Sequence, residues 1–209
     1  MTVPSPAHRG PALRGPNMGI GKQEPTALRT NGSKGIPNPR TASGPPSLVG
    51  GNILTVHISN LKVSNDPKDV LVTYALGSCI AVVIHDPVRV AGGMIHFMLP
   101  RSGVSPAKAV ANPAMYADTG VPLLFRRMYE LGSAREDLVV KVVGGGNLYD
   151  PEGTYNIGER NYGALREVFE KHGIPIAAED VGGSESRTAR LHVGTGIVVV
   201  RSRGREVEL

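Results

Sequence analysis

Short apolar, β-branched runs separated by turn residues follow one another from Gly51 onward, a pattern typical of β-strands. The runs predict seven strands, over Ile53–Ser59, Cys79–His85, Gly92–Leu99, Leu138–Val143, Ile174–Glu179, Arg187–Val193 and Ile197–Arg201. The last two strands are joined by Gly194-Thr195-Gly196. Because glycine accepts the positive φ of tight turns, this segment predicts a hairpin.

Two segments carry helical spacing instead of strand alternation. Over residues 121–131 the apolar side chains recur at three- and four-residue steps, and Gly132 is placed to end the helix. A second apolar stripe predicts a helix over about Gly158–His172, which Gly173 ends. Strands outnumber helices, so the sequence predicts a mixed α/β fold.

Residues 1–50 differ from the rest of the chain in composition. They contain nine Pro and eight Gly, more than the share at which aperiodic Pro/Gly-rich sequence is typically disordered. We therefore expect a disordered, basic tail over residues 1–50 and one folded domain over residues 51–209. The tail is either a solvated extension or a basic tether for an anionic surface. Its scattered charges, with no aromatic residues between them, favour the extension.

The net charge of +5 raises the question of a nucleic-acid partner. The tail holds six of the 23 basic residues and one of the 18 acidic residues, which leaves the body neutral, with 17 of each. Three Phe, six Tyr and no Trp offer few rings on which bases stack. The sequence therefore predicts that no nucleic acid is bound.

The apolar stretches are too short for a membrane-embedded protein. The longest, Leu71–Ile84, has 14 residues and is broken by Thr73 and Gly77, whereas a spanning helix needs about 20 residues. No apolar segment of the kind found in secretory signals stands near Met1. A single cysteine excludes an intramolecular disulfide and a Cys-rich zinc site. We expect a cytoplasmic protein.

The single cysteine, Cys79, is the candidate nucleophile. It stands between a Gly77-Ser78 turn and a continuous apolar strand. A turn at a strand end leaves backbone N–H groups unpaired, and those near Ser78 and Cys79 could hold the oxyanion of an attacked carbonyl. The alternative is a small buried thiol with no chemical role, which is the usual position of a lone cysteine.

The next strand supplies a candidate base for Cys79. Centring the loop on residues 85–90 pairs Ile84 with Ala91, and the same register pairs Cys79 with His96. Opposed residues of an antiparallel pair have Cβ atoms about 4.5–5.5 Å apart, which allows a thiolate–imidazolium pair. His85 lies six residues along the same strand, about 20 Å from the cysteine at roughly 3.3 Å per residue.

An imidazole that acts as a base must be held in one orientation by a group that accepts from its other N–H. Thr73, just before the cysteine turn, is the nearest candidate in the sequence. The segment Gly144-Gly145-Gly146-Asn147 could instead be read as a phosphate-binding loop. It lacks a following Lys-Ser/Thr and the G-x-G-x-x-G spacing, so a turn where two elements approach closely is the better interpretation.

Motifs spread over residues 53–201 carry a resemblance to a known family. They are Leu76-Gly77-Ser78-Cys79, Asp86-Pro87, Gly93-Met94-Ile95-His96-Phe97-Met98-Leu99-Pro100, Lys141-Val142-Val143-Gly144-Gly145-Gly146, Ile157-Gly158-Glu159-Arg160-Asn161, Asp180-Val181-Gly182-Gly183 and Arg187. Together they resemble the signature of the CheD chemoreceptor glutamine deamidases. The resemblance implies a Cys-His-Thr triad, here Cys79, His96 and Thr73. The chain departs from the family's usual smaller, glycine-containing pair at Tyr74-Ala75.

The resemblance also implies a fold, a reaction and partners. The fold is an α/β (α+β) sandwich of mixed sheets flanked by helices. The reaction converts specific glutamines on the cytoplasmic domains of chemotaxis receptors to glutamates and releases ammonia, with no metal or organic cofactor. A CheC-type phosphatase is the implied second partner. The alternative function is a signalling adaptor that binds and regulates this phosphatase, although an adaptor would not need all three triad residues.

Overall fold

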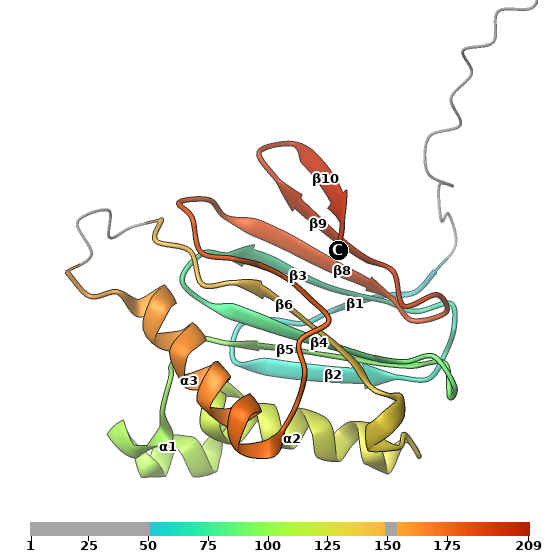
Figure 1. Cartoon of the computed structure of the whole chain (residues 1–209), viewed down its shortest axis with the longest axis horizontal. Helices are drawn as coiled ribbons and strands as arrows, with labels where there is room; N and C mark the ends of the chain where they lie inside the picture. Colours follow the sequence, from blue (N-terminus) through green and yellow to red (C-terminus); the bar gives the residue numbers. More distant parts are fainter. Residues whose placement is uncertain (1–50, 149–153) are drawn as a thin grey trace, which may run out of the picture. The chain divides into compact units, whose positions relative to one another are not determined.

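Two five-stranded sheets form the framework of residues 51–148 and 154–209, the part of the chain that the computed structural model describes (Figure 1). The first sheet has the spatial order β1 (Ile53–Thr55), β3 (Val70–Leu76), β8 (Arg187–His192), β9 (Val198–Ser202) and β10 (Arg205–Glu208). The second has the order β2 (Asn60–Ser64), β5 (Ala91–Phe97), β4 (Ile80–Asp86), β6 (Val139–Gly144) and β7 (Ala178–Val181). The pairs β1–β3 and β6–β7 are parallel and the others antiparallel, so both sheets are mixed.

Helices cover one face of the second sheet (Figure 1). The α-helices are α1 (Pro106–Ala111), α2 (Ala117–Glu130) and α3 (Ile157–His172), and short 3₁₀ turns are η1 (Ser102–Val104), η2 (Pro113–Met115) and η3 (Arg135–Asp137). Helices α2 and α3 pack their apolar stripes on β5 and β4, in a core that includes Ile95 of β5 and Ile80 and Val82 of β4. None of the helices in the described part of the chain is long and apolar enough to cross a membrane.

The other face of the second sheet packs on the first sheet. Ala81 and Val83 of β4 lie in this inter-sheet core together with Leu71 of β3 and Leu191 of β8. Strand β4 is therefore buried on both faces, which explains why its sequence is continuously apolar rather than alternating. The layers follow the order sheet, sheet, helices, and the predicted fold class is confirmed.

A β-bulge interrupts β3 and was not foreseen from the sequence. The pairing of β3 with β8 shifts between Thr73 and Leu76, and Ala75 has a φ of 56°. The extra residue turns both Tyr74 and Ala75 to solvent, while Thr73 and Leu76 are both fully buried. Thr73 faces the inter-sheet core by regular alternation with Leu71, and the bulge returns Leu76 to the same core.

The β4–β5 hairpin is confirmed, but its predicted register is wrong by two residues. Asp86 rather than Ile84 pairs with Ala91, and Ala81 rather than Cys79 pairs with His96. The turn is tighter than expected because the Asp86 carboxylate accepts from two backbone N–H groups within it, at 2.9 Å each. A shift of two residues keeps every side chain on its predicted face, because strand side chains alternate with a period of two.

The other predicted elements agree with the structure apart from their ends, except that the strand predicted over Ile174–Glu179 overlaps β7 only at residues 178–179. Both predicted helices are present as α2 and α3, and Gly173 ends α3 with a φ of 59°. The hairpin at residues 194–196 joins β8 and β9. The sequence patterns did not predict β2, β3, β10 or α1. The predicted tail, residues 1–50, lies outside the described residues.

Candidate active site

Thr73 and His96 meet in the inter-sheet core, one from each sheet. Thr73 Oγ1 lies 2.8 Å from His96 Nδ1, and the same oxygen lies 2.7 Å from the backbone carbonyl oxygen of Val56. A carbonyl only accepts, so the single hydroxyl hydrogen of Thr73 is donated to Val56. Thr73 must then accept a hydrogen bond from His96 Nδ1–H. This contact fixes the tautomer of His96 and leaves the lone pair on Nε2.

The Nε2 atom of His96 is buried and has no hydrogen-bond partner among the described residues. Burial lowers the pKa of His96 to about 4. The ring is therefore neutral at physiological pH, with an unshared lone pair in an apolar layer. An unprotonated Nε2 of this kind can accept a proton from a thiol or a water.

Cys79 lies directly before β4 and is partly exposed. It packs beside the inter-sheet cluster, on the face that also carries Ala81 and, across the ladder, His96. The observed register places Cys79 and His96 one diagonal step apart, about 7–8 Å in a regular ladder. The structure thus brings Thr73, Cys79 and His96 to one end of the inter-sheet layer.

The protonation state of the site differs from the expected thiolate–imidazolium pair. Burial raises the pKa of the Cys79 thiol, and a smaller effect of its own backbone N–H acts in the opposite direction. Since burial also lowers the pKa of His96, both shifts favour the neutral thiol and the neutral imidazole. The resting site is therefore uncharged.

Three consecutive carbonyl groups of the cysteine turn, residues 77–79, are held by hydrogen bonds. The carbonyl oxygen of Gly77 accepts from the N–H of Gly146 at 2.7 Å, and that of Cys79 accepts from the N–H of Gly145 at 2.8 Å. The side chain of Asn161 donates to the carbonyl oxygen of Ser78 at 2.9 Å. Within residues 51–148 and 154–209 the N–H groups of Ser78 and Cys79 have no carbonyl partner. These are the N–H groups to which the sequence analysis gives an oxyanion role, and that role stays a prediction.

The glycine segment after β6 supports the cysteine turn and does not form a phosphate site. A Cβ at Gly144, whose φ is 118°, would lie 2.3 Å from the carbonyl oxygen of Cys79. The N–H groups of Gly145, Gly146 and Asn147 are all donated to backbone carbonyls. No donor of these three remains for an anion, so the predicted close approach of two elements is confirmed.

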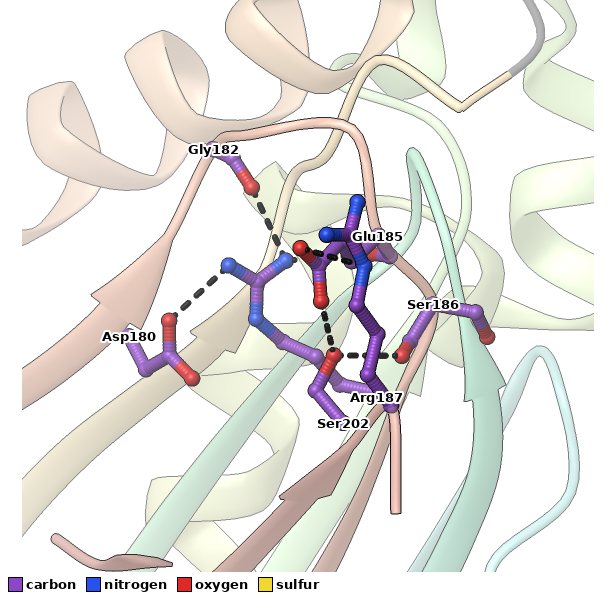
Figure 2. Close-up of polar contacts among 7 residues, drawn as sticks. Asp180, Gly182, Glu185, Ser186, Arg187 and Ser202 are labelled. Carbon is purple, nitrogen blue, oxygen red and sulfur yellow. Dashed lines mark hydrogen bonds and ion pairs between the residues drawn. The ribbon is translucent and has the colours of Figure 1, made fainter. Parts of the chain in front are cut away.

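Arg187 stabilises the loop that follows β7, residues 182–185 (Figure 2). Its guanidinium donates to the Gly182 carbonyl at 2.8 Å and to the Asp180 carboxylate at 2.9 Å. The same loop receives the N–H of Asn147 on the carbonyl of Gly183. Figure 2 also shows the Glu185 carboxylate accepting from Ser202, at 2.7 Å. Hydrogen bonds thus run from Arg187 through two loops to the cysteine turn.

His85 and His192 lie outside this site. His85, at the far end of β4, contacts the carbonyl oxygen of Val193 through Nε2 at 2.9 Å, and His192 lies on β8. Sequence reasoning missed Val56, Gly145, Gly146 and Asn161, all of which hold the site through long-range contacts with backbone atoms. Two signals in the sequence could have indicated some of them: the glycine run contains Gly145 and Gly146, and the Ile157–Asn161 motif contains Asn161.

Comparisons with known proteins place this architecture in context. A family model described as CheD chemotactic sensory transduction matches residues 98–202. A probable chemoreceptor glutamine deamidase, CheD 2 of Anaeromyxobacter dehalogenans, is 48% identical over 151 residues, covering 72% of this chain and 95% of the relative. Probable chemoreceptor glutamine deamidase CheD 1 of Syntrophus aciditrophicus is 47% identical over 149 residues, covering 71% of this chain and 93% of the relative.

Proposed function

The chain belongs to the CheD family, and from that membership and the site we propose that it deamidates glutamine side chains of chemoreceptors. Cys79 is the proposed nucleophile, His96 the general base and acid, and Thr73 the residue that orients His96. The names of the relatives support the substrate class. The observation that carries the mechanism is the Thr73–His96 contact of 2.8 Å, which leaves a neutral, unpartnered Nε2 on the face of the sheet that also carries Cys79.

In the first half-reaction, His96 Nε2 takes the proton of the Cys79 thiol as Sγ attacks the carboxamide carbon of the glutamine. The oxyanion that forms accepts hydrogen bonds from the N–H groups of Ser78 and Cys79. The protonated His96 then gives its proton to the departing nitrogen. The C–N bond breaks, ammonia leaves, and a thioester to Cys79 remains.

In the second half-reaction, His96 Nε2 removes a proton from water, which attacks the thioester carbonyl. The C–S bond breaks, Cys79 recovers its proton from His96, and the product is glutamate. The net change consumes one water and releases one ammonia for each glutamine. Thr73 contributes a neutral acceptor, so the imidazolium charge is formed only during the reaction and is not stabilised at rest.

The test is incubation with a receptor cytoplasmic fragment, followed by ammonia assay and intact-mass analysis of the fragment. Wild type should release ammonia and raise the fragment's mass by the difference between NH₂ and OH. Cys79→Ala should lower turnover by at least about 10³-fold, because no second cysteine can replace the nucleophile. Turnover by Cys79→Ala near the wild-type rate would reject the assignment of Cys79.

Two further parts of the proposal follow from the family resemblance. The receptor domains that CheD proteins modify are cytoplasmic, so we place this protein in the cytoplasm, and a CheC-type phosphatase is a proposed second partner. The adaptor alternative is tested with the same variant. If Cys79→Ala and wild type regulate the phosphatase equally and neither modifies receptors, the protein is an adaptor.

A further inference from the structure

Asn161, on the second turn of α3, is buried against the cysteine turn. Its side chain is fully buried, and both hydrogens of its carboxamide nitrogen are donated to backbone carbonyls. The acceptors are Ser78, at 2.9 Å, and Met98, at 3.1 Å. The helix reaches this position because Gly158 packs directly on the glycine segment, where a Cβ would lie 2.4 Å from the carbonyl oxygen of Gly145.

The two carbonyls that Asn161 binds lie where the β4–β5 ladder ends. The last ladder pair is Ile80 with Phe97, and the same register would next place Cys79 opposite Met98. That pair is not formed, and β4 begins only after the cysteine. One carboxamide thus connects the cysteine turn to the end of β5, in place of the ladder.

The bond to Ser78 also sets the orientation of a peptide group that the proposed reaction uses. In a trans peptide the C=O and the N–H point in opposite directions. Holding the carbonyl of Ser78 toward α3 therefore directs the N–H of Cys79 away from α3. This N–H is one of the two proposed oxyanion donors.

The remaining atom of Asn161 argues against a purely stabilising role. Its Oδ1 is buried and has no hydrogen-bond partner among the described residues. An unpaired buried acceptor opposes folding. The carboxamide is therefore better explained by what its two N–H groups hold in place.

We propose that Asn161 is a positioning residue, which fixes the Ser78–Cys79 peptide so that the thiol and its oxyanion donor keep their reactive geometry. The proposal rests on the proposed deamidase function for its effect on catalysis. The predicted effect of Asn161 on the reactivity of the Cys79 thiol does not depend on the deamidase function. The two effects can therefore be measured separately.

The thiol is measured by iodoacetamide alkylation against pH, which reports Cys79 alone because the chain has one cysteine. In Asn161→Ala the loosened turn should hydrate the thiol, so the midpoint of the alkylation profile should shift down toward an ordinary cysteine pKa. Asn161→Leu keeps the approximate side-chain shape without a cavity but removes both donors, and it should shift the profile in the same direction. It serves as the test should the alanine variant fail to fold.

Catalysis is measured as kcat and KM for receptor deamidation. Both Asn161 variants should lower kcat by about 10²-fold, the size of a misplacement of about 1 Å, with KM nearly unchanged because a fully buried side chain does not touch the substrate. The matched control is Phe169→Leu, which weakens the packing of the same helix without touching the cysteine turn. It should alter neither the alkylation profile nor kcat.

A wild-type alkylation profile in the folded Asn161 variants would overturn the proposal. So would equal changes in Phe169→Leu, since these would come from lost stability alone. If wild type deaminates no receptor glutamine, the proposed function fails, and the alkylation profiles still decide the role of Asn161.

Discussion

The single hydroxyl hydrogen of Thr73 determines which chemistry His96 can perform. Because that hydrogen is donated to Val56, the hydroxyl oxygen accepts from Nδ1 and the lone pair remains on Nε2. A carboxylate at the same position would accept equally well. It would also stabilise the imidazolium and raise the pKa of His96, whereas a hydroxyl leaves the ring neutral.

We predict that Thr73→Val lowers kcat by at least about 10-fold, because His96 loses the group that fixes its tautomer and orientation. Valine keeps the shape of threonine but leaves the His96 Nδ1–H and the Val56 carbonyl without a partner. Thr73→Ser is the matched control and should retain most of the activity. Steady-state deamidation kinetics of the three proteins provide the measurement, and equal losses in both variants would contradict the orienting role.

A second prediction concerns stability against pH. The pKa of His96 is about 4 in the folded protein and 6.5 ordinarily, so below pH 6.5 the unfolded chain binds a proton that the folded protein does not. His96 therefore stabilises the fold fully above pH 6.5. This stabilisation is lost as the pH falls toward 4, by about 3 kcal/mol in total.

The measurement is urea unfolding of wild type and His96→Asn between pH 7 and pH 4. Asparagine does not titrate and keeps a donor toward Thr73. Over this range the free energy of unfolding of wild type should fall by about 3 kcal/mol more than that of the variant. The contributions of other titrating groups cancel in the difference. Parallel curves for the two proteins would show that His96 is not held neutral.

At the scale of elements, the hairpin shows what the sequence could predict about the site. Counting residues from the Asp86-Pro87 turn placed Cys79 and His96 on one face, and that face is correct although the register is shifted by two. Turn chemistry explains the shift, because the Asp86 carboxylate shortens the loop. A count of residues alone could not include that effect.

Three strands, β2, β3 and β10, were not predicted from the sequence, each for a physical reason. The bulge at residues 74–75 breaks the alternation of β3, so its residues merged with those of β4 into one apolar stretch. Strand β10 is exposed at all four positions and therefore carries no apolar pattern. Strand β2 has polar residues at both ends, Asn60 and Ser64.

The glycine segment supports a prediction at this scale. Gly144→Ala forces a positive φ on alanine and places its Cβ against the Cys79 carbonyl oxygen, so the cysteine turn must move. Deamidation should fall by about 10²-fold or more. The matched control, Gly163→Ala, adds a methyl group on the open face of α3, and it should keep full activity while stabilising the protein by about 0.5–1 kcal/mol.

Circular dichroism melts and ammonia-release rates of the two variants provide the measurement. Full activity in Gly144→Ala would show that the cysteine turn tolerates displacement. It would thereby contradict the role given to the glycine segment.

For the whole molecule, the contacts that build the site join residues far apart in the sequence. Thr73 and His96 are 23 residues apart, and Ser78 and Asn161 are 83 apart. No local pattern encodes such contacts. Thr73 was a candidate by its place in the sequence and was identified chiefly through the family resemblance, and the part proposed for Asn161 became visible only in the packed structure.

The tail gives the last prediction. Its composition predicts that residues 1–50 add little to the folded body, so their deletion should leave the melting temperature and the deamidation rate nearly unchanged. Calorimetry and ammonia release on full-length and shortened protein provide the measurement. A loss of many degrees would show that the tail packs on the body.

Because the site lies between two sheets, the activity of the enzyme depends on the distance between those sheets. Thr73 and Val56 belong to the first sheet and its extension, while His96 and Cys79 belong to the second. The 2.8 Å contact between Thr73 and His96 weakens if the two sheets separate by a few tenths of an ångström, long before the core is exposed to water. A redesigned inter-sheet core could therefore melt at an unchanged temperature and still yield an inactive protein, so activity is a finer probe of that core than thermal stability.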